Sequence, residues 1–183
     1  MANCYTKNQI PQLKDRIIFF DANILVYLFV PTGNRYCENG YSSVFSLLIK
    51  QKNKFVVDFI VLSEFINRAI RIDYDNYLQL NNIGKNSLSF KQFRNQEEGK
   101  ERLQQLYDLV INRILKHFEV IENGINHEDI VSMLSVDSLD FNDKAVQNIC
   151  AKNGFILLTH DQDFVNADVD ILSTNNKLIS PIS

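Results

Sequence analysis

Short apolar runs that stop at polar residues recur along the chain, and helical spacing fills the intervals between them. In RIIFFDANILVYLFV the run at about 16–20 ends at an aspartate, and further apolar runs lie at 55–57 and 155–158. Two more strands are expected at 118–121 and 169–172, although each of these segments contains one acidic residue. Uninterrupted apolar runs of this length are typical of strands buried on both faces of a parallel sheet. Because parallel strands need crossovers, which are usually helical, the alternation predicts an α/β fold. We expect a doubly wound, mostly parallel sheet of four to five strands flanked by helices.

The helices between these strands have recognisable start and stop residues. Asn23 is predicted to cap a helix that runs to Val30, and Asp58 to cap a helix over about 59–73. Gly154 follows a helix expected over 143–153, at the position where glycine commonly ends a helix. The other helices are expected at about 37–52, after a turn signal at 31–34, and at 96–117 and 126–134.

The region 74–116 is predicted to be a helical elaboration, interrupted by the polar segment NNIGKNSLSF. Because no repeat or long linker divides the chain, we expect a single domain over 1–183.

The charge balance excludes proteins that bind nucleic acid through a broad basic surface. Lys and Arg number 19 against 22 Asp and Glu, which gives a formal net charge of −3. A nuclease remains compatible with this balance, because bound cations can supply positive charge that the sequence lacks.

The cysteine and hydropathy patterns favour a reduced, cytoplasmic protein. Cys4, Cys37 and Cys150 have neither the spacing of a zinc site nor that of a redox motif. The first 16 residues contain no apolar segment typical of a signal peptide. The most apolar stretch, 17–30, is interrupted by polar residues and is too short to span a bilayer, so we expect no membrane function.

Acidic residues stand at the ends of predicted strands or near the starts of predicted helices. Asp21 and Asp161 directly follow strands. Glu64 lies on the polar face of the helix after the second strand, and Asp143 begins the helix before the fourth. Each has an ordinary explanation as a turn residue, a helix-dipole charge or a solvated side chain. Because ligands bind beyond the carboxyl ends of parallel strands, their joint position favours one shared site.

Clustered carboxylates repel one another unless cations are bound. Oxygen ligands suit Mg²⁺ or Mn²⁺, and the sequence has no His or Cys cluster that would favour zinc. One or two such ions activate water and stabilise the charge that develops in phosphoryl transfer. The acids therefore predict a metal-dependent phosphoryl-transfer site.

Three segments resemble the PIN-domain ribonucleases, a family that includes the VapC-type toxins of bacterial toxin–antitoxin pairs. The segments are IIFFDANILVYL, VVDFIVLSEFINR and LDFNDKAVQNICAKNGFILLTHDQDF. The third is the most specific, because it joins a helix start, a helix, a glycine stop, a strand and an acid in one run.

The resemblance implies a PIN-like fold that binds Mg²⁺ or Mn²⁺ through four catalytic acids: Asp21, Glu64, Asp143 and Asp161. It further implies that Asn23 orients the first carboxylate and that Thr159 positions the fourth acidic segment. Asp163 is an additional or substitute ligand, and Asp140 a less favoured one.

Two positions depart from the family pattern. Lys144 follows the third acid where the family usually has a small apolar residue, so we expect Lys144 to face the site or the substrate. Asp58 stands where a small hydroxyl residue is usual.

Basic residues near the acids are candidates for substrate contacts. Arg68 and Arg71 lie one and two helical turns beyond Glu64 and are expected to meet a phosphate. His160, beside Asp161, is a further candidate for contact with substrate.

A second candidate surface lies at 85–102. Lys91 and Arg94 alternate there with Phe90 and Phe93, a composition typical of phosphate binding and base stacking. An exposed, solvated surface is an equally good interpretation, because acidic residues dilute the charge of this segment.

Two functions remain open. The first is a divalent-metal-dependent endoribonuclease that cleaves RNA, the toxin of a toxin–antitoxin pair, with an antitoxin protein as partner and a homodimer as assembly. The alternative is a catalytically inactive PIN-like module that binds RNA or protein, which retention of all four acids disfavours. A dehalogenase-like phosphatase would need a second aspartate where this chain has Asn23, and the sequence contains no Gly-rich P-loop.

Overall fold

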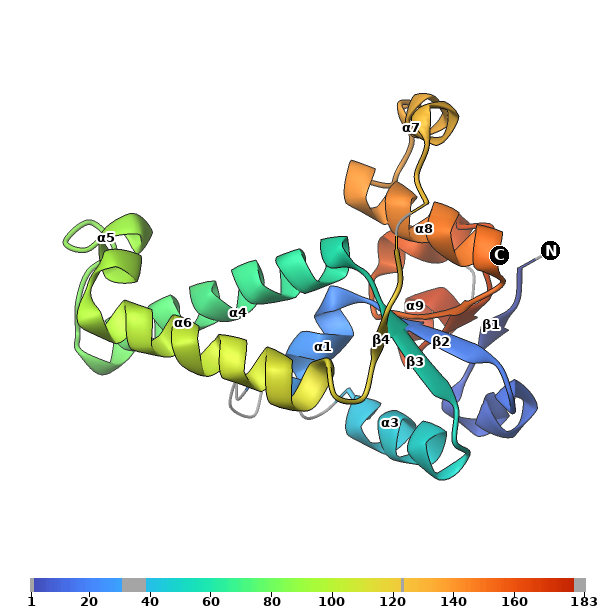
Figure 1. Ribbon diagram of the computed structural model, residues 1–183, viewed down its shortest axis with the longest axis horizontal. Helices are drawn as coiled ribbons and strands as arrows, with labels where there is room; N and C mark the ends of the chain where they lie inside the picture. The colour runs from blue at the N-terminus through green and yellow to red at the C-terminus, as the bar shows by residue number, and fades with distance from the viewer. Residues whose placement is uncertain (1, 31–38, 123, 180–183) are drawn as a thin grey trace.

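A parallel sheet of six strands lies at the centre of the computed structural model, which describes residues 2–30, 39–122 and 124–179 (Figure 1). The strand order is β1-β6-β5-β2-β3-β4, and every neighbouring pair is parallel. The strands are β1 (Cys4–Tyr5), β2 (Ile17–Phe20), β3 (Lys54–Val57), β4 (Glu119–Val120), β5 (Ile156–Leu158) and β6 (Ile171–Leu172). The expected doubly wound α/β fold is confirmed, with one strand more than the four to five predicted. The additional strand β1 is two residues long and has no apolar run that marks it.

The strand order places a topological switch point between β2 and β5. From β2 the chain advances through β3 to β4, and it then returns to β5 on the other side of β2. Because crossovers between parallel strands are right-handed, the helices of the two halves cover opposite faces of the sheet. Figure 1 shows α3 on one side of the central strands and α8 on the other.

Helix α1 (Ala22–Phe29) begins one residue beyond the end of β2, two residues earlier than an N-cap at Asn23 would place it. The prediction that Asn23 caps this helix is wrong. Asp21 occupies the N-cap position, and its backbone carbonyl accepts from the amides of Ile24 and Leu25. The side chain of Asn23 lies inside the first turn and is therefore free to contact the Asp21 carboxylate.

Two other predicted helix boundaries are confirmed and one is wrong. Asp58 caps α4 (Phe59–Leu80), accepting from the Val61 amide at 2.8 Å. Gly154 ends α8 (Phe141–Asn153) with φ +64°, in the left-handed region that favours glycine. Asp143 does not begin α8. Asp140 is its N-cap, and its Oδ1 accepts from the Asp143 amide at 2.9 Å.

The elaboration predicted at 74–116 forms an arm with the end of α4. Helix α4 continues to Leu80, past the expected end at 73, because Tyr74 and Leu78 are buried and keep the apolar face of the helix covered. The chain then forms α5 (Phe90–Asn95) and α6 (Glu97–Leu109), followed by a π-helical turn at Val110–Ile114. Figure 1 shows α4 and α6 side by side, extending away from the sheet with α5 at the far end.

The aromatic residues of α5 hold the end of this arm together. Phe93 is fully buried, and its ring lies 5.5 Å from that of Tyr74 and 5.1 Å from that of Tyr77. Phe90 packs against Tyr74 at 5.5 Å and is only partly exposed. Of the two interpretations of 85–102, the one that includes base stacking by Phe93 is therefore wrong, because its ring belongs to the core of the arm.

The shorter elements are the 3₁₀ helices η1 (Lys7–Leu13) and η3 (Gln162–Asn166) and the α-helices α3 (Tyr41–Lys50), α7 (His127–Met133) and α9 (Asn176–Ile179). Cys4 and Cys150 are free thiols, whereas Cys37 and the turn signal at 31–34 lie outside the described residues. Across the described ranges, no helix combines the length and the apolar character that a membrane span requires.

We expect Gly99→Ala to destabilise the arm. A Cβ at position 99 would lie 1.9 Å from the carbonyl oxygen of Phe93, so the backbone of α5 has to shift. Steric conflict of this kind costs about 1–3 kcal/mol of unfolding free energy, whereas alanine normally favours a helix over glycine. Thermal melting of Gly99→Ala and of Gly124→Ala, where nothing lies within 4 Å, provides the measurement and its matched control. A melting temperature for Gly99→Ala equal to that of the parent would contradict this packing.

Candidate functional site

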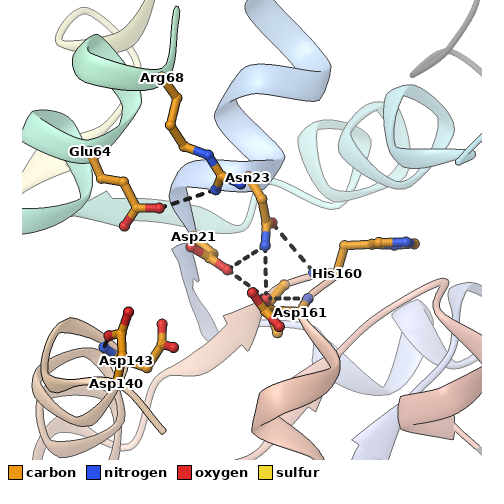
Figure 2. A network of polar contacts seen from close by, with 9 residues as sticks. Asp21, Asn23, Glu64, Arg68, Asp140, Asp143, His160 and Asp161 are labelled. Atoms are coloured by element: carbon orange, nitrogen blue, oxygen red, sulfur yellow. Dashed lines mark hydrogen bonds and ion pairs between the residues drawn. The ribbon is translucent and has the colours of Figure 1, made fainter. Parts of the chain in front are cut away.

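The candidate site lies where β2 and β5 end, at the switch point of the sheet. Asp21 follows β2, Thr159 follows β5, and both side chains are buried. Thr159 donates from Oγ1 to Asp21 Oδ2 at 2.6 Å, and Asn23 Nδ2 donates to the same oxygen at 2.7 Å (Figure 2). One oxygen of the Asp21 carboxylate is thus fixed by two donors from different strand ends.

The protonation of Asp21 is shifted by its surroundings. Burial raises the pKa of Asp21 to about 6, and the hydrogen bond from Thr159 opposes this rise. The charges of Glu64 and Asp161 raise the pKa further. The Asp21 carboxyl group therefore lies close enough to two acids that are distant in the sequence for their charges to shift its pKa.

Glu64 enters the site from the second turn of α4. It is half-buried and pairs with Arg68 one turn later, at 3.1 Å between Oε1 and Nη1. Burial raises the pKa of Glu64, the Arg68 charge lowers it, and Asp140 raises it again. Because both partners are substantially exposed, this ion pair contributes little to stability and leaves Arg68 able to exchange partners.

Asp143 comes from the first turn of α8, and it has the most strongly shifted pKa of the group. Burial raises the pKa of Asp143 to about 7, and the charge of Asp140 contributes next. Smaller contributions come from Asp21, Asp161 and Glu64. All four predicted acids are thus brought to one region of the molecule, as Figure 2 shows.

The two further acids, Asp140 and Asp163, lie differently with respect to the carboxylate cluster. Asp140 affects both Glu64 and Asp143 electrostatically, and Figure 2 shows it beside Asp143. Asp163 is exposed, and its backbone amide donates to Asp161 Oδ1 at 3.1 Å. The structure therefore gives Asp140 a closer relation to the carboxylate cluster than Asp163.

The donor set suits a hard divalent cation. It consists of carboxylate oxygens whose negative charges raise one another's pKa, which is the repulsion that a divalent cation relieves. In the described residues, no three His, Cys, Asp or Glu side chains converge closely enough to ligate one ion in the positions shown. Ligation by the cluster therefore needs side-chain rotation, which is open to the exposed Asp140 and the partly exposed Glu64.

Sequence reasoning missed the residues that support Thr159 from behind. Tyr41 OH lies 3.0 Å from the Thr159 carbonyl, and Ser173 Oγ donates to that carbonyl at 2.7 Å. Tyr41 OH also lies 3.0 Å from His160 Nδ1. These residues come from α3 and from the end of β6, and no local pattern connects them to the acids.

Of the predicted substrate contacts, Arg68, Arg71 and His160 lie near the acids. Arg71 lines a cavity of about 380 Å³ together with Glu64 and Arg68. Its guanidinium also lies over the Phe90 ring, 4.6 Å from the centroid. Arg71 therefore lies between the cavity that contains Glu64 and the first residue of α5.

Lys91 and Arg94 are not brought to the carboxylates. Both lie on α5, which packs against α4 and α6 at the far end of the arm (Figure 1). Both are exposed, and Arg94 packs over Phe90 at 5.9 Å.

The expectation that Lys144 faces the site or the substrate is wrong. Lys144 is buried, and its Nζ donates to the carbonyls of Met133 and Ser135. It also pairs with Asp137 Oδ2 at 3.0 Å. Lys144 thus fastens the loop between α7 and α8, because an ammonium ion in this position must satisfy its hydrogen bonds within the protein.

Comparison with known proteins finds similarity at the level of fold. No family model and no curated protein sequence matches the chain. A structure of VapBC2 from Rickettsia felis, bound to a DNA fragment from their promoter, matches with 16% identity and a TM-score of 0.50 over 86% of this chain and 97% of that one. FitAcB from Neisseria gonorrhoeae matches with 13% identity and a TM-score of 0.53, over 86% of this chain and 97% of that one. FitAB bound to an IR36 DNA fragment matches with 13% identity and a TM-score of 0.53, over 86% of this chain and 94% of that one.

The chain has the fold of these toxin–antitoxin structures. The PIN-like fold expected from the sequence resemblance is therefore confirmed. Identities of 13–16% show the fold alone, so the chemistry of the site rests on this chain's own residues.

In the metal-free protein, the free energy of unfolding should fall as pH rises from about 4 to about 7. Asp21 and Asp143 bind protons more tightly in the folded protein than in the unfolded chain, so raising the pH through this window disfavours the folded state. The fall should be smaller in Asp143→Asn, which lacks one of these groups. Urea unfolding in chelator at about pH 5 and about pH 8 measures the difference.

The matched control for this prediction is Asp168→Asn, which alters an exposed carboxyl group. We expect Asp168→Asn to follow the parent. If Asp143→Asn and the parent lose the same stability between the two pH values, Asp143 does not belong to a repelling cluster.

Proposed function

We propose that the protein is a divalent-metal-dependent endoribonuclease. The observation that carries this proposal is the meeting of Asp21, Glu64, Asp143 and Asp161 from four separate elements at the switch point. Such a group of charges weakens the metal-free fold, which makes a purely structural role a poor explanation for it. The sequence resemblance to PIN-domain ribonucleases supports RNA as the substrate.

The four acids would hold Mg²⁺ or Mn²⁺, with Asp140 as a further carboxylate at the edge of the cluster. When bound, such an ion supplies an activated water and stabilises the charge that develops on a phosphodiester. Thr159 and Asn23 hold Asp21 in place through its Oδ2 atom. Arg68, which pairs with Glu64 across a partly exposed surface, can turn to a substrate phosphate.

We further propose a toxin role in the cytoplasm, with an antitoxin protein as partner. The support is the likeness in fold to structures of VapBC and FitAB complexes, two of which are bound to DNA fragments. A homodimer remains a prediction of the sequence resemblance. The inactive RNA- or protein-binding module stays the alternative, and an RNA cleavage assay that compares the parent with Asp21→Asn distinguishes it from the nuclease.

Purified protein should cleave single-stranded or hairpin RNA in the presence of Mg²⁺ or Mn²⁺, and addition of a chelator should stop the cleavage. Asp21→Asn should lower the rate by about 100-fold or more, because it alters a central metal-binding group. The exposed variant Asp168→Asn should cleave at the parental rate. Gel analysis of diverse labelled RNAs gives the rates. Equal, residual cleavage by the parent and Asp21→Asn would leave the inactive binding module as the better description.

Metal should stabilise the parent more than Asp143→Asn. Stabilisation follows RT ln(1 + [metal]/Kd), about 2.7 kcal/mol when the free metal is 100 times Kd. Asp143→Asn binds metal more weakly, so its melting temperature should rise less. Thermal melting of both proteins in chelator and in millimolar Mn²⁺ makes the comparison, and an equal gain in both would remove Asp143 from the ligand set.

A further inference from the structure

A polar cavity of about 400 Å³ adjoins the carboxylate cluster, and its walls include Arg68, Lys177, His160, Tyr27, Asn175 and Asp161. We propose that this cavity binds one nucleotide of the RNA strand beside the phosphodiester that is cut. The phosphate of this nucleotide lies at Arg68 and Lys177, and its base lies against the rings of His160 and Tyr27. This subsite rests on the proposed function, because it belongs to the same site.

The aromatic wall of the cavity is fixed before any ligand arrives. The His160 ring is perpendicular to those of Tyr27 and Tyr41, at centroid distances of 5.7 and 5.6 Å. Tyr27 and Tyr41 stack on each other at 5.7 Å, and Tyr41 OH lies 3.0 Å from His160 Nδ1. Figure 2 shows the imidazole directed away from the Asp21 carboxylate. A rigid ring that takes no part in holding the acids provides a preorganised contact for a flat base.

The same wall is tied to the end of β5. Asn175 Nδ2 donates to the His160 carbonyl at 2.7 Å, and the Asn175 amide donates to Ser173 Oγ at 3.0 Å. Ser173 Oγ in turn donates to the carbonyl of Thr159. These hydrogen bonds fix the position of the cavity wall relative to Thr159, whose hydroxyl group donates to Asp21. A subsite next to the reacting phosphodiester requires such a fixed position.

The cations of the cavity favour a phosphate as part of the ligand. Lys177 Nζ donates to the neutral Gln162 Oε1 at 2.9 Å, and within the described residues it makes no ion pair. Arg68 shares its charge with the exposed side of Glu64. Together they outnumber the single carboxylate of the wall, Asp161. Guanidinium and ammonium groups beside aromatic rings suit a nucleotide better than an acidic peptide, which has no use for the rings.

Arg68 also lines the cavity that contains Glu64 and Arg71, and among the residues that the structure describes it alone lines both. A strand that crosses the carboxylate cluster therefore meets a cation at the boundary between two cavities. The nucleotide in the cavity lined by His160 would then lie on one side of the cleaved bond. The nucleotide on the other side of that bond would lie in the cavity lined by Glu64 and Arg71.

The first experiment observes the cavity directly by NMR of the three histidine rings in the full chain. The His160 signals are assigned with His160→Gln, and 5′-mononucleotides are added at constant, saturating Mg²⁺. We expect the ring signals of His160 to move while those of His117 and His127 stay. In Lys177→Gln the same shift should require about threefold more nucleotide. An unmoved His160 overturns the proposal, as does an equal shift with inorganic phosphate or with a short glutamate peptide.

The second experiment measures binding of a non-cleavable 2′-O-methyl RNA by fluorescence anisotropy over a salt series. Lys177→Gln should weaken binding about threefold and reduce the slope of log affinity against log salt by about 0.7, because one phosphate contact is lost. The matched control is Lys50→Gln, at the end of α3 shortly before the amino end of β3, whereas the cavity lies at the carboxyl ends of the strands. Equal affinity and slope in the two variants would overturn the phosphate contact.

These outcomes separate the subsite from the proposed function. If the parent cleaves RNA but nucleotides leave His160 unmoved, the nuclease stands and the subsite is wrong. If nucleotides move His160 and RNA is never cut, the subsite is supported as a nucleotide site and the proposed nuclease fails.

Discussion

The hydrogen bond from Thr159 to Asp21 joins the ends of the two central strands, and it fixes one oxygen of the carboxylate around which the other candidate acids gather. β2 and β5 are neighbours in the sheet although the paired residues Phe20 and Leu158 are 138 positions apart in the sequence. Their ends diverge into α1 and η3, which opens space for ligands at a switch point. Because Thr159 and Asn23 hold one oxygen of Asp21, the carboxylate stays buried at this opening despite the charges around it.

The sheet and the positions of the acids along it could be predicted because their signals are local. An apolar run followed by an acid marks β2, and Asp58 and Gly154 mark helix ends through contacts within a few residues. β1 and the length of α4 could not be predicted in this way. β1 exists because its two residues pair with β6, and α4 extends because α5 and α6 bury its far half. In both cases, tertiary contacts decide the structure.

The acids of the candidate site and two of their supports, Asn23 and Thr159, were visible in the sequence, whereas the residues that hold the Thr159 carbonyl were not. Tyr41 contacts a carbonyl 118 residues away, and a tyrosine near the start of a helix carries no sign of that role. For Lys144, in contrast, the sequence suggested a role in the site that the structure does not show. Its neighbour Asp143 suggested the site, but on a helix adjacent residues point about 100° apart, and Lys144 points into the loop that precedes α8. Adjacency in the sequence was therefore a poor guide to orientation, while strand-end position was a good one.

Stability and proposed function oppose each other at the switch point. Burial and mutual repulsion shift the carboxyl groups of Asp21 and Asp143 toward protonation near neutral pH, so their charged forms weaken the metal-free fold. The surrounding core offsets this cost through packing: Phe20, next to Asp21, contacts the rings of Phe45, Phe55 and Phe118. A rigid apolar core beside the cluster also prevents the carboxylates from relaxing apart through movement of β2. The repulsion is consequently retained in the folded protein, and a bound divalent cation would relieve it without moving the backbone.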